Sequence, residues 1–185
     1  MRVIAGTFKG RRLKTPTWTG LRPTSDKLRE TMFNVLGQRL DGASVLDGYA
    51  GTGAIGIEAF SRGAGHVTFI DRDRRAVGLI RENLQVCGVG AGYTIEHGDV
   101  AAVLARLPGD QRFDVVVLDP PYDLEHLGDV LDAAGRRLGP GGILILERAA
   151  RVEPDVPTSL IRMRDIRSGD SALTLFRRPE EQHES

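Results

Sequence analysis

The feature of the chain with the clearest chemical potential is a segment that combines a carboxylate, two prolines and an aromatic ring: Asp119-Pro120-Pro121-Tyr122. It lies at the end of a strongly apolar run, residues 113–119, which is typical of a buried strand. Proline fixes the backbone and has no amide donor, so the Asp119 carboxylate and the Pro120 carbonyl are left as acceptors. Two acceptors can hold the hydrogens of an amine conjugated to a planar base, and the Tyr122 ring can stack on that base. We therefore predict that these four residues form a catalytic site that positions an exocyclic amine.

A glycine-rich loop follows another predicted strand, residues 44–47. From Gly51 to Gly56 it reads G-x-G-x-x-G, a pattern also found in nicotinamide dinucleotide sites. In those sites the first glycine follows the strand almost directly, whereas here Asp47 ends the strand and three residues separate it from Gly51. A carboxylate at that position repels a pyrophosphate and suits a positively charged ligand. S-adenosylmethionine has a sulfonium, an ammonium group and no phosphate, so the loop favours it as the cofactor.

Two further acidic residues follow predicted strands. Asp71 ends the strand 66–71, where a carboxylate can accept hydrogen bonds from both ribose hydroxyls of an adenosine cofactor. Asp99 follows the strand 93–97 and could accept a hydrogen bond from the adenine amine, although a lone Asp after a strand is more often a helix cap. Val100 is a candidate for one wall of the adenine pocket. Because parallel strands end at one edge of a sheet, these side chains are expected to share one site.

Short apolar runs alternate with helical patterns after residue 42, which predicts a parallel sheet covered by helices on both faces. The expected strands are residues 44–47, 66–71, 93–97, 113–119 and 142–147, and the expected helices are 53–61, 74–86, 100–106 and 127–137. Residues 160–166 and 171–177 have no helix between them and should form an antiparallel hairpin at the sheet edge. Upstream, we expect two short strands that turn around Gly6 and Gly10, then a helix from Thr24 or Ser25 to Leu36.

The net charge of zero hides an asymmetry along the chain. Residues 1–30 carry eight Lys and Arg against two acidic residues, a net charge of +6, and the remainder carries −6. A basic segment on an acidic body suits contact with a nucleic-acid backbone, although a solvated charged edge is an equally good explanation. The residues expected to contact RNA are Arg2, Lys9, Arg11, Arg12 and Lys14. We expect residues 1–23 to form this basic segment, 24–178 the catalytic domain and 179–185 a frayed tail.

Length and composition set further limits. A chain of 185 residues fits one domain, and its apolar runs are too short to span a bilayer. Cys87 is the only cysteine, which leaves no disulfide framework and no cysteine zinc cluster, so no metal is expected. The N-terminus lacks the long apolar region of a signal peptide. We therefore expect a monomer in the cytoplasm, without a membrane partner.

The whole pattern resembles the class I methyltransferases and, among them, the RsmD-type 16S rRNA guanine-N2 methyltransferases. The resemblance covers nearly the full length, through residues 2–6, 10–11, 22–24, 29–36, 50–53, 58–59, 61–64, 71, 83–84, 99, 119–122 and 169–171. It implies an α/β, Rossmann-like fold with a seven-stranded, mostly parallel sheet and an antiparallel last strand, plus a small N-terminal β-hairpin and helix extension. The family usually has a Leu-Phe-like pair where this chain has Gly48-Tyr49, so the pocket beside the methionine tail is expected to differ in shape.

The resemblance also implies roles for particular residues. Arg22 to Thr24 would close over the cofactor, and Asp119 to Tyr122 would bind the target guanine. The residues expected to bind S-adenosylmethionine are Arg22, Pro23, Thr24, Asp47, Tyr49, Gly51, Gly53, Asp71, Arg72, Asp99, Val100 and Asp119. The implied reaction transfers a methyl group to the N2 amine of a guanine in small-subunit rRNA, either naked or within an assembling 30S particle.

Several other functions fit parts of the pattern. DNA adenine-N6 methyltransferases share the tetrapeptide, but this chain has no room for their usual target-recognition region. Protein glutamine methyltransferases have Asn in place of Asp119. A nicotinamide oxidoreductase would need an acid–base residue near the cofactor, and the four histidines are poorly placed for that role. A non-catalytic ribosome-assembly factor would not need an intact tetrapeptide.

Overall fold

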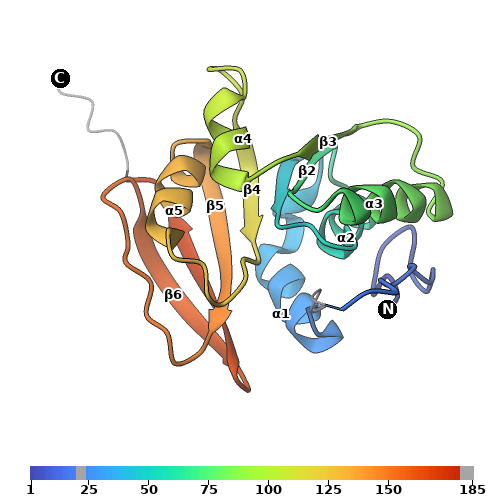
Figure 1. Ribbon diagram of the computed structural model, residues 1–185, viewed down its shortest axis with the longest axis horizontal. Helices are drawn as coiled ribbons and strands as arrows, with labels where there is room; N and C mark the ends of the chain where they lie inside the picture. Colours follow the sequence, from blue (N-terminus) through green and yellow to red (C-terminus); the bar gives the residue numbers. More distant parts are fainter. Residues whose placement is uncertain (20–23, 180–185) are drawn as a thin grey trace.

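A seven-stranded sheet forms the centre of the protein in a computed structural model, which describes residues 1–19 and 24–179. The strand order is β3-β2-β1-β4-β5-β7-β6 (Figure 1). The strands are β1 (Ser44–Gly48), β2 (His66–Asp71), β3 (Tyr93–His97), β4 (Phe113–Leu118), β5 (Leu138–Ala149), β6 (Ile161–Ser168) and β7 (Ser171–Arg177). The predicted α/β architecture is confirmed.

Only β7 runs against the parallel direction of the sheet. β1 pairs in parallel with both β2 and β4, β2 with β3, and β4 with β5. β7 is antiparallel to both β5 and β6, so the two tail strands form the predicted hairpin at the sheet edge. The parallel strands consequently end together, and the loops after β1, β2, β4 and β5 meet at one edge.

Helices cover both faces of the sheet. The helices are α1 (Asp26–Leu36), α2 (Ala54–Ser61), α3 (Arg74–Val86), α4 (Val100–Arg106) and α5 (Leu127–Gly135), with a short 3₁₀ helix, Gly37–Leu40. One core cluster joins α1, α2 and α3 to the first face, and the other joins α4 and α5 to the second face. Ser25 caps α1 by accepting a hydrogen bond from the Leu28 amide, as one of the two expected N-caps.

The main error in the sequence prediction concerns β5. This strand was expected at residues 142–147 but extends from Leu138 to Ala149. Gly139-Pro140-Gly141-Gly142 reads as a turn, yet Leu138 pairs with Phe113 before a register shift, so the strand starts earlier. The remaining boundaries differ by at most two residues.

The N-terminal residues form a hairpin-like loop without regular strands. The two strands predicted around Gly6 and Gly10 reduce to one antiparallel bridge between Arg2 and Arg12. The loop is nevertheless integrated into the protein, because Val3 and Leu13 belong to the core cluster of α1 to α3. The predicted domain boundary at residue 23 falls in the stretch that the structure does not describe, so it stays a prediction.

A buried carboxylate fixes this N-terminal loop to α2. Glu58 is fully buried and accepts hydrogen bonds from the amides of Ile4 and Ala5, at 2.8 and 2.9 Å. It also accepts one from Arg62 Nε at 2.8 Å and lies 4.0 Å from Nη1 of the buried Arg29. The paired charges offset part of the cost of burial.

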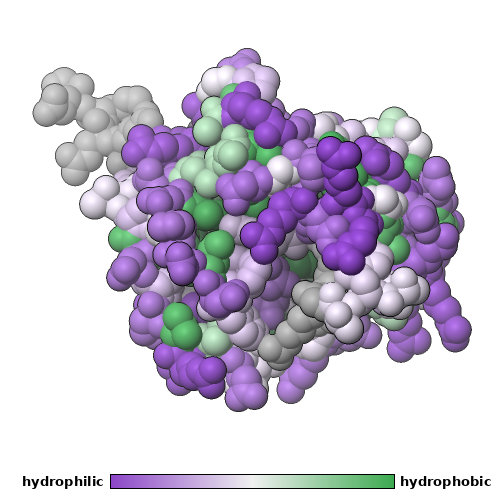
Figure 2. All heavy atoms as spheres, in the orientation of Figure 1, coloured by the Kyte–Doolittle hydropathy of each residue, from purple (hydrophilic) through white to green (hydrophobic). Residues whose placement is uncertain are grey.

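The surface in Figure 2 is mostly hydrophilic, with separate small hydrophobic areas. In the part of the chain that the structure describes, no helix combines the length and hydrophobicity needed to cross a bilayer.

Candidate active site

A pocket of about 320 Å³ opens at the edge where the parallel strands end. It brings together nine of the residues predicted for the site, from four separate segments of the chain. These are Thr24, Tyr49, Gly51, Asp71, Arg72, Asp119, Pro120, Pro121 and Tyr122. The tetrapeptide predicted to be catalytic and the glycine loop therefore share one cavity.

The tetrapeptide follows directly after β4. Asp119 Oδ2 accepts a hydrogen bond from Thr24 Oγ1 at 2.7 Å, which links the tetrapeptide to the chain just before α1. Tyr122 Oη and Ser171 Oγ, at the start of β7, lie 3.0 Å apart and form a hydrogen bond. Tyr122 is 45% exposed, so it offers ring surface to a stacking partner while its hydroxyl is held in place.

Asp71 shapes the glycine loop. Its Oδ2 accepts a hydrogen bond from the Gly51 amide at 2.8 Å, and its Oδ1 accepts one from the Asp73 amide at 2.8 Å. Gly51 has φ 57°, a left-handed conformation that glycine adopts without strain. Carboxylate oxygens can accept more than one hydrogen bond, so Asp71, which lines the pocket, still has acceptor capacity for a ligand.

The third glycine of the pattern serves packing. A Cβ atom at Gly56 would lie 2.2 Å from the ring of Phe69 in β2. Helix α2 can therefore approach the sheet only because residue 56 has no side chain.

Tyr49 places a polar atom in the wall of the pocket. Its hydroxyl is buried and has no hydrogen-bond partner among the described residues. Burial raises the pKa of Tyr49, and the nearby Asp99 carboxylate raises it further. The hydroxyl therefore stays protonated near neutral pH and can donate a hydrogen bond to a ligand.

Asp47 is not exposed to the pocket. It is almost completely buried, and its Oδ2 accepts a hydrogen bond from the Gly56 amide at 2.8 Å in the first turn of α2. Burial raises the pKa of this carboxyl group, the Gly56 hydrogen bond opposes that shift, and Asp119 and Asp71 add to it. Gly53, also expected at the cofactor, is the N-cap of α2 and does not line the pocket either.

The structure places Asp99 and Val100 outside the lining of the pocket. Asp99 caps α4 through a hydrogen bond from the Ala102 amide to its Oδ1, at 3.1 Å, and this was the alternative function considered for it. Val100 is buried in the core cluster on the α4 and α5 face. Arg22 and Pro23 lie outside the described residues.

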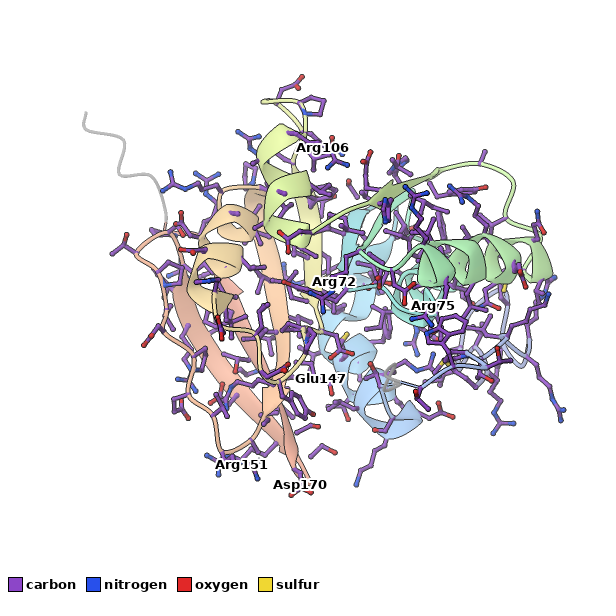
Figure 3. The ribbon with its side chains drawn as sticks, in the orientation of Figure 1. Arg72, Arg75, Arg106, Glu147, Arg151 and Asp170 are labelled. Carbon is purple, nitrogen blue, oxygen red and sulfur yellow. The ribbon has the colours of Figure 1, made fainter. Side chains whose placement is uncertain are left out.

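Sequence reasoning missed several residues that line the pocket, among them Trp18, Arg29, Thr52, Arg75 and Glu147. Glu147 ends the predicted strand 142–147, so the signal that singled out Asp47 and Asp71 was present there too. Figure 3 shows Glu147 near the centre of the molecule beside β5, with Arg72 and Arg75 above it in this view. Arg29 lines the pocket but is fully buried, and it donates a hydrogen bond to the Arg2 carbonyl at 2.9 Å.

All five basic residues predicted to contact RNA are exposed: Arg2, Lys9, Arg11, Arg12 and Lys14. They belong to the loop that packs on α2 and α3. Arg11 lies over the Phe8 ring and donates to the Val86 carbonyl, and Lys14 pairs with Glu82 at 2.7 Å. Met1 and Trp18, which precede and follow these residues in the sequence, line the pocket. Among the described residues, no group of three or more His, Cys, Asp or Glu could hold a metal ion.

The sheet order, the reversed β7 and the pocket at the carboxyl edge define a class I methyltransferase of Rossmann-like fold. Residues 1–177 match the family described as conserved hypothetical protein 95. The chain therefore belongs to this family, the RsmD family, and is a methyltransferase.

Curated relatives and solved structures agree with this assignment. Ribosomal RNA small subunit methyltransferase D of Escherichia coli K12 is 32% identical over 188 residues, which cover 100% of this chain and 93% of that protein. The Haemophilus influenzae protein of the same name is 38% identical over 123 residues, 66% of this chain and 64% of that one. The solved structure of a hypothetical protein from Thermus thermophilus has a TM-score of 0.79 at 30% identity, and covers 95% of this chain and 98% of that one.

Proposed function

We propose that this protein transfers a methyl group from S-adenosylmethionine to the exocyclic N2 amine of a guanine in small-subunit rRNA. The observation that carries the proposal is the shared pocket, in which Asp119 and Tyr122 lie with the glycine loop. The names of the E. coli and H. influenzae relatives support small-subunit rRNA as the substrate.

The pocket residues fit this cofactor. Asp71 lines the pocket next to Gly51 and is suited to accept hydrogen bonds from ribose hydroxyls. The buried Tyr49 hydroxyl needs an acceptor, and cofactor atoms in the pocket could supply one. Asp99 is close enough to influence Tyr49, so the adenine end would lie on that side. When bound, S-adenosylmethionine supplies a methyl group on a positively charged sulfur.

Asp47 has a different role in this proposal from the one expected. Its carboxyl group holds the start of α2 and thereby positions the glycine loop, so it acts on the cofactor through the loop. Gly53 acts in the same indirect way as the N-cap of that helix.

The tetrapeptide positions the amine. An amine conjugated to a purine is a weak nucleophile because its lone pair is delocalised into the ring. The Asp119 carboxylate and the Pro120 carbonyl would accept hydrogen bonds from its two N–H groups, which favours a pyramidal nitrogen with its lone pair available for methylation. The nitrogen would lose one of these protons when it is methylated. The Tyr122 ring, held by Ser171, stacks on the guanine. Catalysis is then mainly positioning and electrostatic stabilisation, which is worth about 10²–10³-fold for a single well-placed group.

The basic N-terminal loop would bind the RNA backbone. Its five exposed cations provide affinity without base recognition. Since the loop is fixed to α2 through Glu58, bound RNA would be held at a constant position relative to the pocket.

The test is transfer of a radiolabelled methyl group from S-adenosylmethionine to three acceptors, followed by nucleoside analysis. The acceptors are protein-free small-subunit rRNA, 30S particles that lack the modification, and duplex DNA. We expect label in N2-methylguanosine from at least one RNA acceptor. Label in N6-methyladenine from DNA would show that the substrate is DNA adenine and not rRNA guanine. If the protein binds S-adenosylmethionine but labels none of the three acceptors, the proposed activity is rejected.

A further inference from the structure

We propose that Glu147 recognises the Watson–Crick edge of the target guanine by accepting a hydrogen bond from its N1–H group. This inference rests on the proposed function and deepens it. It names the residue that makes the site prefer guanine to adenine.

Register places Glu147 beside Asp119. β4 and β5 pair in parallel, with Val117 opposite Ile145 and Leu118 opposite Leu146, and the next step along both strands leads to Asp119 and Glu147. Side chains alternate between the two faces of a sheet. Val117 and Ile145 belong to the core cluster of α1 to α3, and Leu118 and Leu146 to the opposite cluster. Both carboxylates therefore project from adjacent strands toward the same face, and both line the pocket.

The position of Glu147 is well defined. It is 6% exposed, and its backbone pairs with Leu173 of β7 on the side away from β4. Glu147 follows directly after Leu146, the last residue of β5 that pairs with β4, and a paired strand fixes the direction of its side chains better than a loop does. The carboxylate is therefore a fixed acceptor in the pocket wall, on the β5 side of the tetrapeptide.

The chemistry of the two purines makes this acceptor selective. Guanine carries N1–H next to its N2 amine, so a base whose amine lies at Asp119 presents a second donor close by. Adenine has an unprotonated N1 next to its amine, and an ionised carboxylate can only accept hydrogen bonds. The lone pair of adenine N1 would face the carboxylate acceptor without a hydrogen bond, which disfavours the wrong base. Sites built to bind an N–H group reject analogues that lack it by about 10⁴–10⁵-fold.

The experiment compares guanine with 2-aminopurine at the target position of a synthetic RNA, in single-turnover methylation. 2-Aminopurine keeps the N2 amine but has no N1–H, and its N1 accepts hydrogen bonds. We expect the wild-type protein to prefer guanine by at least about 10²-fold. The E147Q amide can donate to N1 of 2-aminopurine. In this variant the ratio of the guanine rate to the 2-aminopurine rate should therefore fall by at least about 10-fold. An unchanged ratio of the two rates would overturn the proposal.

Two controls separate the possible failures. Glu125→Gln makes the same change at an exposed residue near the tetrapeptide and should leave the preference unchanged. Glu147→Asp keeps a carboxylate, which cannot donate to N1 of 2-aminopurine, so its guanine preference should exceed that of E147Q. A preference below that of E147Q would contradict base recognition. If the wild-type protein produces no N2-methylguanosine, the proposed function fails. If the wild-type protein does produce N2-methylguanosine, but E147Q and the wild type have the same ratio of guanine to 2-aminopurine rates, only the role of Glu147 fails.

Discussion

The acidic residues at the ends of β1, β2 and β3 differ in their hydrogen bonding from those at the ends of β4 and β5. Asp47, Asp71 and Asp99 each accept hydrogen bonds from backbone amides. Asp119 accepts one from a side-chain hydroxyl, and Glu147 lies beside it in the pocket. In the proposed function, the first group therefore shapes the loops around the cofactor, whereas the second presents carboxylates to the substrate.

This difference shows that an acidic residue at a strand end has no fixed role. A carboxylate that accepts a nearby amide stabilises a turn or helix start, and that bond alone is worth about 1.5–3 kcal/mol. A carboxylate whose nearby backbone is proline has fewer amides to bind, because proline has none. Pro120 and Pro121 thus offer Asp119 no backbone amide, which suits the role proposed for its carboxylate toward the substrate amine.

The largest predicted effect is on Asp119. The Asp119→Ala variant should lose about 10³-fold in single-turnover methylation at saturating cofactor, because it removes one of the two acceptors of the amine. The rate of N2-methylguanosine formation measures this effect. A variant that retains full activity would remove Asp119 from the mechanism.

Substitution of Glu58 is the strongest test of how much a carboxylate that accepts hydrogen bonds from backbone amides contributes to stability. Glu58→Ala should lower the free energy of unfolding by about 3 kcal/mol, because it removes the buried carboxylate that pairs with Arg62 and lies 4.0 Å from Arg29, and it leaves the amides of Ile4 and Ala5 without their acceptor. Denaturant unfolding measures this loss. Glu30→Ala, at an exposed position of α1, is the control and should change stability by less than about 0.5 kcal/mol. Equal stability of the two variants would mean that Glu58 does not fix the N-terminal loop.

RNA affinity should depend on the basic N-terminal loop and not on the acidic residues at the strand ends. Charge reversal of Arg11 and Arg12 together should weaken RNA binding by roughly 10- to 100-fold and reduce its salt dependence, since two phosphate contacts become repulsive. Cofactor affinity should stay the same. Filter binding at several salt concentrations measures both quantities. Unchanged RNA affinity would remove the loop from the substrate interface.

The smallest predicted effect concerns the pH dependence of stability at Asp47. Its folded pKa is raised above the usual value of 3.8, mainly by burial, so its contribution to stability is present below that value and is lost as pH rises. Asn keeps an acceptor for the Gly56 amide and cannot ionise. The stability of Asp47→Asn relative to the wild type should therefore increase, by on the order of 1 kcal/mol, as pH rises above the usual pKa of 3.8. A difference independent of pH would show that Asp47 does not titrate in this range.

The sequence predicts the architecture well where local signals are strong. β2, β3, α3 and α4 occur at the expected residues, because apolar runs and the capping residues Asp73 and Asp99 mark their limits. The sequence also predicts the tetrapeptide and the glycine loop as parts of the site, because each is a local pattern that directly follows an apolar strand. It could not show that Asp47 faces the helix start, or that Glu147 lies beside Asp119. Both facts depend on how segments distant in the sequence come together in the fold.

The most direct test of this division is the cofactor affinity of two matched variants, Asp71→Asn and Asp119→Asn, measured by calorimetry with S-adenosylmethionine. Asp71→Asn should weaken binding by about 10-fold or more, because the charge at the ribose is lost and the glycine loop is held less firmly. Asp119→Asn should bind the cofactor within about twofold of the wild-type affinity. Equal losses in the two variants, or a loss confined to Asp119→Asn, would contradict the separation of cofactor binding from amine activation.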